Sequence, residues 1–383
     1  MSKLPISVII FTVVLSFVKN STVRRKIMKN SSGGNFFGGD VIIVNGKVIS
    51  GDETCERREF DERKSQDSGC VEKIVIDSAV ADVNVVSAKA SAIDVHFSGK
   101  AYVDGNVRFF VKLVGNEFKI AVEVEGNCYM SDFKLNVIVP QKSFKAISIA
   151  GCFRDVCIDN EHVVTQKLEV KNSSGKIDIR RGECVKQISL QTSSGNVYVD
   201  HVHGNERMAI KTSSGRIAVG KFVWSRFIDL ETTTGNIDMI GLAAEIIEVK
   251  TSSGKIEANE SFFTNKLKVQ TTTGNIGITD GDVSEELEVK TTSGKLKANL
   301  TCANSLVNTT NGNVEMHFNA DRDIKVKVST STGKVITSFA NIKRMNLSTK
   351  SKCGKIKNWH INSFWGYRAN VDISTVTGNI EIK

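Results

Sequence analysis

The chain has 383 residues, of which 40% are hydrophobic, and this content excludes an intrinsically disordered protein. Its 51 basic and 42 acidic residues give a formal net charge of +9. Because acidic residues are interspersed with the lysines, and the only compact basic cluster in the sequence is Arg24 to Lys26, we assign the excess to solvated strand faces and expect no nucleic-acid binding.

An apolar stretch of fifteen residues runs from Leu4 to Val18, directly after Lys3. Its length suits the core of a signal peptide better than a membrane-spanning helix, which needs roughly 18 residues or more. Basic residues follow the stretch, and by the positive-inside rule they would hold the body of an anchored protein in the cytoplasm. We predict a secreted or cell-surface protein with a signal peptide at 1–18. The alternative is a short membrane anchor with the body facing the cytoplasm.

Residues 19–69 read as a flexible, polar lead-in, in which Asn45 and Gly46 between apolar runs predict a hairpin. The charged last third of this lead-in is expected to be loose. Over residues 70–165 apolar and polar residues alternate in successive short runs, which predicts strands. This stretch lacks the glycine corner described next, so we expect irregular β coils that cap the regular solenoid repeats at 166–383.

A glycine preceded by small polar residues recurs about every twenty positions through the second half of the chain. These glycines are Gly175, Gly195, Gly215, Gly235, Gly254, Gly274, Gly294, Gly312, Gly333, Gly354 and Gly378. A fixed period of this length indicates a solenoid, in which each unit buries its apolar face against its neighbours. Apolar residues fall two apart within each unit, so we predict an all-β fold, a β-solenoid (β-helix) of about twenty-residue coils with an irregular N-terminal cap region.

Within the repeat, one strand position is expected to point inward in every coil: Ile210, Leu230, Val249, Val269 and Val289. The period of two then places a threonine ladder inward, with hydroxyls bonded to one another or to turn backbone groups: Thr212, Thr232, Thr251, Thr271 and Thr291. We expect the glycine to supply a left-handed or strained corner, where a Cβ would be penalised.

The residue after the glycine alternates between a basic side chain and asparagine, in the order Lys176, Asn196, Arg216, Asn236, Lys255, Asn275, Lys295 and Asn313. If each repeat is one coil, the alternation moves like charges from about 4.8 Å to about 10 Å apart and relieves their repulsion. If the coil instead has 40 residues, consecutive glycines would lie on opposite faces. The sequence leaves both interpretations open.

The chain has eight cysteines, an even number that is compatible with disulfides in an oxidising compartment. Cys152 and Cys157 are the closest expected pair, and buried free thiols are an equal alternative. No cysteine and histidine set has the spacing of a four-ligand zinc site, and His201 with His203 is a weak candidate. We assign no metal-binding residue.

Several segments resemble a known family. They are Ala81 to Val85 after an apolar strand, Ile93 to Val95 leading to Ser98-Gly99, Leu135 to Pro140, and the serial SSGK and TTGN turns. Over about residues 70–383 the chain resembles the "putative adhesins" of the β-strand-repeat, head GIN-domain type, a family of unknown function. The resemblance implies a β-solenoid, often exported or attached to an envelope, with a role in adhesion. It implies no catalytic residues.

An enzyme of the polysaccharide-cleaving β-helix type would need acids clustered on adjacent coils. Asp178, Asp238 and Glu257 occupy equivalent repeat positions, but the sequence gives them no convergent partner, and solvated strand faces explain them. Nucleophile-elbow, zinc-protease and phosphate-loop motifs are absent from the sequence. We therefore predict a non-enzymatic surface or structural scaffold without catalytic or cofactor-binding residues, and the alternative is a carbohydrate-active enzyme.

The longest interval between repeat glycines, from Gly354 to Gly378, is rich in aromatic residues. We take these as the candidate partner-binding residues, for an unknown macromolecule or a glycan surface: Trp359, His360, Phe364, Trp365 and Tyr367. A cap packed on the core is the competing explanation. The sequence stops inside a predicted strand at 379–383, which predicts an open edge capable of end-to-end self-association.

Overall fold

The structure is a computed structural model that describes residues 56–129, 131–151, 153–259, 262–359 and 365–383. The predicted signal peptide and the Asn45-Gly46 hairpin lie outside these residues. The chain divides into two compact units. The described residues of the smaller unit are 56–60, 98–107, 124–129 and 131–133. The larger unit, here called the solenoid unit, comprises 61–97, 108–123 and 134–383.

The described residues form strands and contain no helix. At the N-terminal side the strands are β2 (Glu56–Asp67), β3 (Lys73–Ser78), β4 (Asp82–Ala88), β5 (Ala92–Val114), β6 (Glu117–Tyr129), β7 (Lys134–Pro140) and β8 (Ser143–Gly151). Then follow β9 (Val156–Lys171), β10 (Ile177–Thr192), β11 (Val197–Val199), β12 (Val202–His203), β13 (Asn205–Thr212), β14 (Ile217–Val219), β15 (Trp224–Thr232), β16 (Ile237–Ile240), β17 (Ala243–Thr251), β18 (Ile256–Asn259), β19 (Phe263–Thr271) and β20 (Ile276–Thr291).

The C-terminal strands are β21 (Leu296–Asn311), β22 (Val314–Asn319), β23 (Ile324–Thr332), β24 (Val335–Ala340), β25 (Ile342–Cys353), β26 (Ile356–Asn358), β27 (Tyr367–Thr377) and β28 (Ile380–Ile382). The all-β prediction is confirmed. Strand β2 occupies the end of the expected flexible lead-in, which is therefore ordered from Glu56 onward. In the described part of the chain, no segment has the helical, apolar character needed to cross a bilayer.

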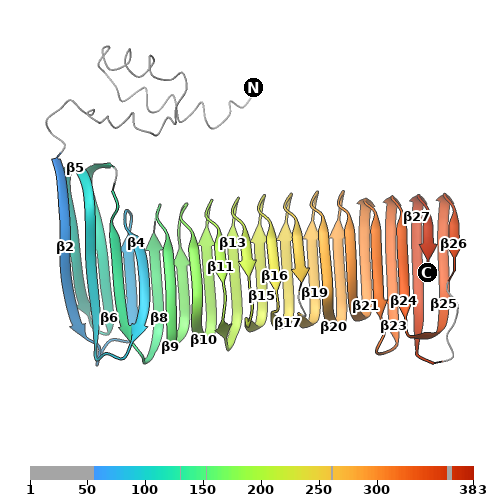
Figure 1. Ribbon diagram of the computed structural model, residues 1–383, viewed down its shortest axis with the longest axis horizontal. Helices are drawn as coiled ribbons and strands as arrows, with labels where there is room; N and C mark the ends of the chain where they lie inside the picture. The colour runs from blue at the N-terminus through green and yellow to red at the C-terminus, as the bar shows by residue number, and fades with distance from the viewer. Residues whose placement is uncertain (1–55, 130, 152, 260–261, 360–364) are drawn as a thin grey trace, which may run out of the picture. The chain divides into compact units, whose positions relative to one another are not determined.

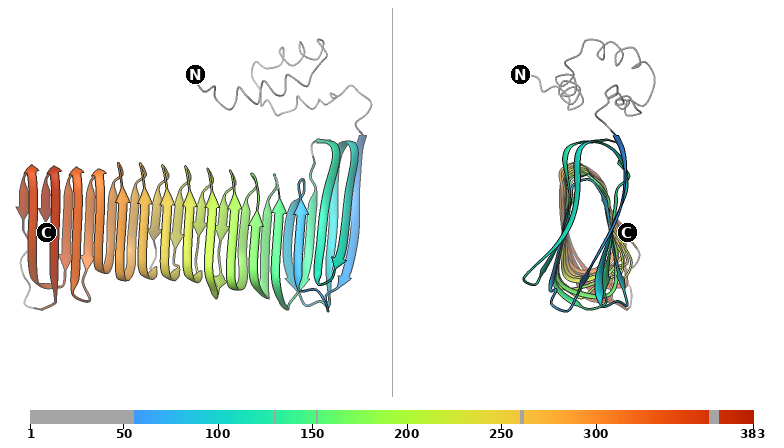
Figure 2. Two further views of the ribbon diagram at one scale, coloured as in Figure 1. Left: turned by 180° about the vertical axis from the view of Figure 1, so that it is seen from behind. Right: turned by 90° about the vertical axis from the view of Figure 1, so that its left-hand side faces the viewer.

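In the middle of the solenoid unit, each strand pairs in parallel with the strand one repeat away. Ile210 is level with Leu230, and Ile217 is level with Ile237, so one coil takes 20 residues. Figure 1 shows these coils side by side, and in the end-on view of Figure 2 the central coils nearly eclipse one another. The 20-residue coil is confirmed and the 40-residue coil is wrong, because consecutive glycines stack on the same face.

Inward positions form continuous columns along the solenoid unit. The five residues predicted to point inward, from Ile210 to Val289, are all at most 2% exposed. A second column on the facing sheet joins Ile217, Ile237 and Ile256 in register. Each coil thus buries its apolar residues against the coils before and after it, which a single coil cannot do.

The threonine ladder is buried as predicted. Four of its five hydroxyls bond to turn backbone groups, those of Thr212, Thr232, Thr251 and Thr271. The Thr291 hydroxyl is the exception, because it has no hydrogen-bond partner. Thr232 Oγ1 accepts the N–H of Gly235 at 3.1 Å and donates to the carbonyl of Gly215, one coil earlier, at 3.3 Å. Thr212 repeats both contacts with Gly215 and Gly195. Each of these two threonine hydroxyls therefore links its own turn to the neighbouring turn through hydrogen bonds.

The reason for the repeat glycine differs from the prediction. Of the repeat glycines, Gly333 alone has a positive φ, so most of these corners are not left-handed. The cause is close stacking instead: a Cβ on Gly235 would lie 1.8 Å from the carbonyl oxygen of Gly215. Gly254 shows the same approach to Gly235, at 1.7 Å. Only a residue without a side chain allows the turns to stack this tightly.

The asparagines that follow the glycine cap the next coil. Asn196 Oδ1 accepts the backbone N–H of Arg216 at 2.8 Å, and Asn236 Oδ1 accepts that of Lys255 at 2.9 Å. The alternation thus has a hydrogen-bonding role that charge repulsion alone does not explain. A basic residue in one coil receives a backbone cap from an asparagine in the coil before it.

Coils at the two ends of the solenoid unit do not stack in chain order. Near the N-terminal side, β3 pairs with both β6 and β8, and β4 pairs with both β7 and β9. The coil made by β3 and β4 therefore lies between two coils that follow it in the sequence.

The last coil of the chain is likewise inserted between two earlier ones. Strand β27 pairs with β23 on one side and β25 on the other, and β28 pairs with β24 and β26. The predicted open edge at 379–383 is therefore wrong, because β28 has a partner on both sides. Strands β25 and β26 form the end of the stack (Figure 1).

Free thiols are found at several described cysteines: Cys70, Cys157, Cys184, Cys302 and Cys353. Cys152, the expected partner of Cys157, lies outside the described residues. Cys184 and Cys302 are buried, and the Cys302 thiol lies 3.1 Å from the backbone carbonyl oxygen of Asn304. Burial raises the pKa of the Cys302 thiol, which keeps it protonated and unreactive.

Candidate binding surface on the terminal coil

We define the terminal coil as residues 342–358, the strands β25 and β26 with the turn between them. It contains six basic residues and no acidic residue: Lys343, Arg344, Lys350, Lys352, Lys355 and Lys357. This count equals two thirds of the net charge of the whole chain, which is +9. From the sequence, a compact basic cluster is expected only at 24–26, and the six basic residues of the terminal coil correct that expectation.

The six basic side chains are all exposed, and none of them forms an ion pair with another described residue. The central coils behave differently. There Lys211 lies 2.6 Å from Glu231, Lys250 lies 3.3 Å from Glu248, and other lysines have similar partners. Positive charge is therefore neutralised locally in these central coils, whereas the terminal coil carries six basic residues without an ion pair among the described residues.

Two acids stand beside the terminal coil, and both belong to the inserted coil. Asp372 is level with Ser348, and Glu381 is level with Lys357. Glu381 is already bonded to Lys334 at 2.7 Å and lies 3.3 Å from Lys383, and these two ammonium groups lower the pKa of its carboxyl. It is therefore engaged by lysines outside the terminal coil.

The aromatic candidates lie next to this charge. Trp359 directly follows β26 and is 54% exposed, and Lys357 Nζ lies 5.2 Å from the centre of its ring. Trp365 is 80% exposed, and Tyr367 begins β27. His360 and Phe364, the two other predicted binding residues, lie outside the described residues. The core-cap explanation fails for Trp359 and Trp365, because both rings are largely in solvent.

The candidate acids do not form a catalytic pair. Asp238 and Glu257 are level on adjacent coils, but each has a base as partner, Arg216 and Lys255 respectively, at 2.5 Å. Asp178 lies three coils from Asp238, or about 14 Å at strand spacing.

Ion pairing also lowers the pKa of some carboxyls, which is the wrong direction for acid catalysis. A general acid needs a raised pKa. The hydrogen bonds from Lys167 and Lys171 lower the pKa of Glu169, and the Arg181 guanidinium lowers that of Asp159.

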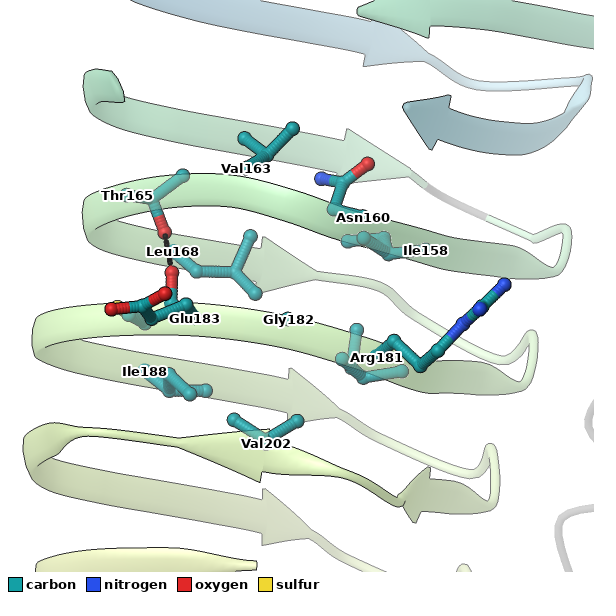
Figure 3. A pocket seen from close by; sticks show the side chains of 12 residues that line it. Ile158, Asn160, Val163, Thr165, Leu168, Arg181, Gly182, Glu183, Ile188 and Val202 are labelled. Atoms are coloured by element: carbon teal, nitrogen blue, oxygen red, sulfur yellow. Dashed lines mark hydrogen bonds between the residues drawn. The ribbon is translucent and has the colours of Figure 1, made fainter. Parts of the chain in front are cut away.

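A small cavity lies inside the coils formed by β9 and β10 (Figure 3). Its volume is about 10 Å³, which is room for about one water molecule. The Asn160 side chain lines it with a buried Oδ1 that has no hydrogen-bond partner, while Thr165 Oγ1 donates to the carbonyl of Glu183 at 3.3 Å. The Arg181 side chain points away from it. The cavity is too small for a substrate.

A family model described as Toastrack DUF4097 matches residues 71–279 and, in a second overlapping match, 205–383. Together these matches span the whole solenoid from β3 to β28. The chain belongs to the Toastrack DUF4097 family. The narrower resemblance to the head GIN-domain type remains a prediction. No curated protein matches this Toastrack protein.

Solved structures with some likeness include a "putative adhesin" from Parabacteroides merdae, 11% identical, with a TM-score of 0.30 over 84% of this chain and 96% of that one. A second "putative adhesin", from Parabacteroides distasonis, is 11% identical with a TM-score of 0.31 over 84% and 97%. A "putative lipid binding protein" from the same species is 11% identical with a TM-score of 0.27 over 87% and 98%. At these TM-scores the likenesses carry no weight for function.

The basic residues of the terminal coil were missed because they are spread over fifteen positions of sequence, between small polar residues. A signal for the coil order was nevertheless present. The alternation of basic residue and asparagine breaks at Lys334 and Lys355, which follow successive glycines without an asparagine between them. In space Asn379 supplies the missing cap, since its Oδ1 accepts the N–H of Lys355 at 2.9 Å.

Proposed function

We propose that this Toastrack protein is a non-enzymatic surface scaffold, an adhesin-like β-solenoid that binds a macromolecular partner or glycan surface through its terminal coil. The observation that carries the proposal is the uncompensated charge there. Six exposed basic side chains lack ion-pair partners among the described residues, whereas lysines of the central coils are paired. Uncompensated charge of one sign attracts a partner of the opposite sign.

The aromatic residues support a binding role for the same end. Trp359 and Trp365 expose large apolar rings beside the basic side chains, and aromatic residues are enriched where proteins bind partners. In the rest of the described chain, the ion pairs of Asp238 and Glu257 disfavour the alternative of a carbohydrate-active enzyme.

We also propose that the protein is exported to the cell surface or secreted. This part rests on the apolar stretch at 4–18 alone. A disulfide framework would also indicate an oxidising compartment, but Cys157, Cys184 and Cys302 are free thiols. N-terminal sequencing of the mature protein tests it. Cleavage near Phe17 supports export, and a retained stretch from Leu4 to Val18 supports the cytoplasm-facing anchor.

The binding role is tested by retention on a panel of immobilised surfaces: neutral glycans, a sulfated polysaccharide, duplex DNA, and neutral and anionic lipid vesicles. The test variant is Lys350→Gln/Lys352→Gln/Lys355→Gln. Its matched control, Lys211→Gln/Lys250→Gln/Lys290→Gln, removes the same charge from ion-paired positions. We expect at least one surface to retain the wild type and the control but not the test variant. Equal retention of both variants, or no retention of the wild type, contradicts the proposal.

A further inference from the structure

We propose that the partner of the terminal coil is a lipid bilayer surface that carries anionic phospholipids. This inference rests on the proposed binding function and names the chemical class of its partner. It is carried by three features of the terminal coil: the kind of charge, the residues that accompany it, and the shape of the surface.

The charge is mostly lysine. Five of the six basic residues are lysines, whose ammonium groups act as point charges on flexible stems and do not select one planar, bidentate ligand geometry. Clusters of four to eight basic residues of this kind recognise anionic membrane surfaces, where each residue adds to the attraction without a fixed partner. A cluster of six falls within that range.

The residues beside the lysines suit the boundary between water and lipid. Ile356 is 43% exposed within the terminal coil, and Trp359 is 54% exposed directly after it. Tryptophan and tyrosine prefer the headgroup level of a bilayer, because one edge of the ring is polar and the rest is apolar. The contact of Lys357 Nζ with the Trp359 ring places one cation over such an anchor.

The terminal coil also presents an open strand edge. Strands β25 and β26 each pair with one inserted strand, and no described strand covers their other edge. Two hollows of the solenoid unit lie in other coils, lined by residues between 158 and 202 and between 263 and 319. A coil at the end of a stack presents an edge that can approach a planar surface.

Lysines on an exposed edge strand have a simpler explanation, since they prevent the edge from pairing with another chain. That explanation requires charge but no partner, and it leaves the exposure of Ile356 and Trp359 unaccounted for. The two explanations predict different behaviour toward vesicles. If the lysines only protect the edge, the full chain should not bind to vesicles.

The first experiment is co-sedimentation of the full chain with phosphatidylcholine vesicles and with vesicles that also contain phosphatidylglycerol. We expect binding to the anionic vesicles only, weakened by salt. Lys350→Gln/Lys352→Gln/Lys355→Gln should weaken it on the order of 100-fold, and the matched Lys211→Gln/Lys250→Gln/Lys290→Gln variant should bind as the wild type does. No binding to anionic vesicles overturns the inference.

The second experiment uses tryptophan fluorescence and separates membrane contact from general affinity for polyanions. The chain has three tryptophans, Trp224, Trp359 and Trp365. In Trp224→Phe/Trp365→Phe, the emission of Trp359 should shift to the blue with anionic vesicles but not with duplex DNA or a sulfated polysaccharide. In Trp359→Phe/Trp365→Phe, Trp224 should report no shift.

The outcomes distinguish this inference from the broader function. Retention on sulfated polysaccharide or DNA that needs the terminal lysines, with no shift of Trp359 on vesicles, preserves a binding role and overturns the membrane assignment. Failure on every surface overturns both. A blue shift of Trp224 equal to that of Trp359 would also contradict a contact made by the terminal coil.

Discussion

At the scale of single residues, the repeat glycine and the threonine three positions before it are the points where adjacent coils touch most closely. Thr232 bonds to Gly235 in its own turn and to Gly215 in the turn before. Because the same contact recurs in successive coils, a substitution at one of these positions disturbs only its own turn and the adjacent turn. The glycine is needed for space and the threonine for hydrogen bonds.

Gly235→Ala is expected to lower the free energy of unfolding by about 3 kcal/mol or more, because its Cβ would lie 1.8 Å from the carbonyl oxygen of Gly215. The matched control is Gly182→Ala, where a Cβ meets nothing within 4 Å and φ is not positive. Urea denaturation measures both. A similar midpoint shift in the two variants would contradict the stacking explanation.

Thr232→Val is expected to cost about 1–3 kcal/mol, because it leaves the Gly235 N–H and the Gly215 carbonyl without their side-chain partner. Thr309 is buried in the same ladder, but its Oγ1 has no hydrogen-bond partner. Thr309→Val should therefore be neutral or stabilising. Equal losses of stability in the two variants would show that the hydroxyl bonds contribute nothing.

At the scale of strands, ion pairs form between charged side chains on the outer face of a strand. Glu169 in β9 lies 2.7 Å from both Lys167 and Lys171, and these contacts lower the pKa of its carboxyl below the usual 4.5. A lowered folded-state pKa means that the pair stabilises the protein fully above the unfolded-state value. The contribution is lost as the pH falls through the folded-state pKa.

The urea midpoint should thus fall as the pH is lowered from about 6 to about 3, and it should fall less in Glu169→Gln, which has no carboxyl to protonate. Lys167 and Lys171 remain charged over this range, so Glu169 is the titrating partner. If the variant and the wild type lose the same stability over this range, Glu169 does not contribute in the way its contacts indicate.

The order of coils at the C-terminal end is a second property of the elements. Ser329 in β23 is level with Ser374 in β27, their hydroxyl oxygens are 3.2 Å apart, and Ser374 is level with Lys350 in β25. If coils stacked in chain order, Ser329 would instead be next to Lys350.

Ser329→Cys/Ser374→Cys should therefore form a disulfide on mild oxidation, and Ser329→Cys/Lys350→Cys should not, because a whole coil separates the second pair. Peptide mass spectrometry of the oxidised proteins reads out both. A bridge in the second pair and none in the first would show that the last coil is not inserted.

The central coils could be predicted from sequence because their pattern is local. The period of two indicated which face of Ile210 and Thr212 is buried. The glycine spacing indicated the repeat length but left coils of 20 and 40 residues open, and the strand register decides for 20. The predicted reason for the glycine failed, since the approach of Gly235 to Gly215 depends on how neighbouring turns stack. The order in which coils stack at the ends could not be predicted, for a similar reason. Consecutive units of a chain normally stack on one another, and the break in the asparagine series at Lys355 was the sequence signal that this order changes.

At the scale of the solenoid unit, insertion of the last coil decides which residues form the end of the stack. It covers the apolar β28 on both sides and leaves the basic strands β25 and β26 outermost. Two terminal coils brought end to end would face six basic residues with six more, which opposes self-association through this surface. The same charge favours an anionic partner.

The candidate partner-binding residues illustrate what sequence could and could not supply. Trp359, Trp365 and Tyr367 were identified from the long interval between glycines, and the structure shows Trp359 and Trp365 largely exposed. Their basic neighbours could not be assigned to one surface before the order of coils was known, because the terminal coil is not the last coil of the sequence.

Hydrogen exchange of the full chain, followed by mass spectrometry, with and without vesicles containing phosphatidylglycerol, tests whether the terminal coil is the contact surface. We predict slower exchange confined to residues 342–359, while the central coils from β13 to β20 exchange as they do in free protein. Protection spread over the central coils, or no change at 342–359 under conditions where the protein binds, would contradict the assignment of the terminal coil as the contact surface.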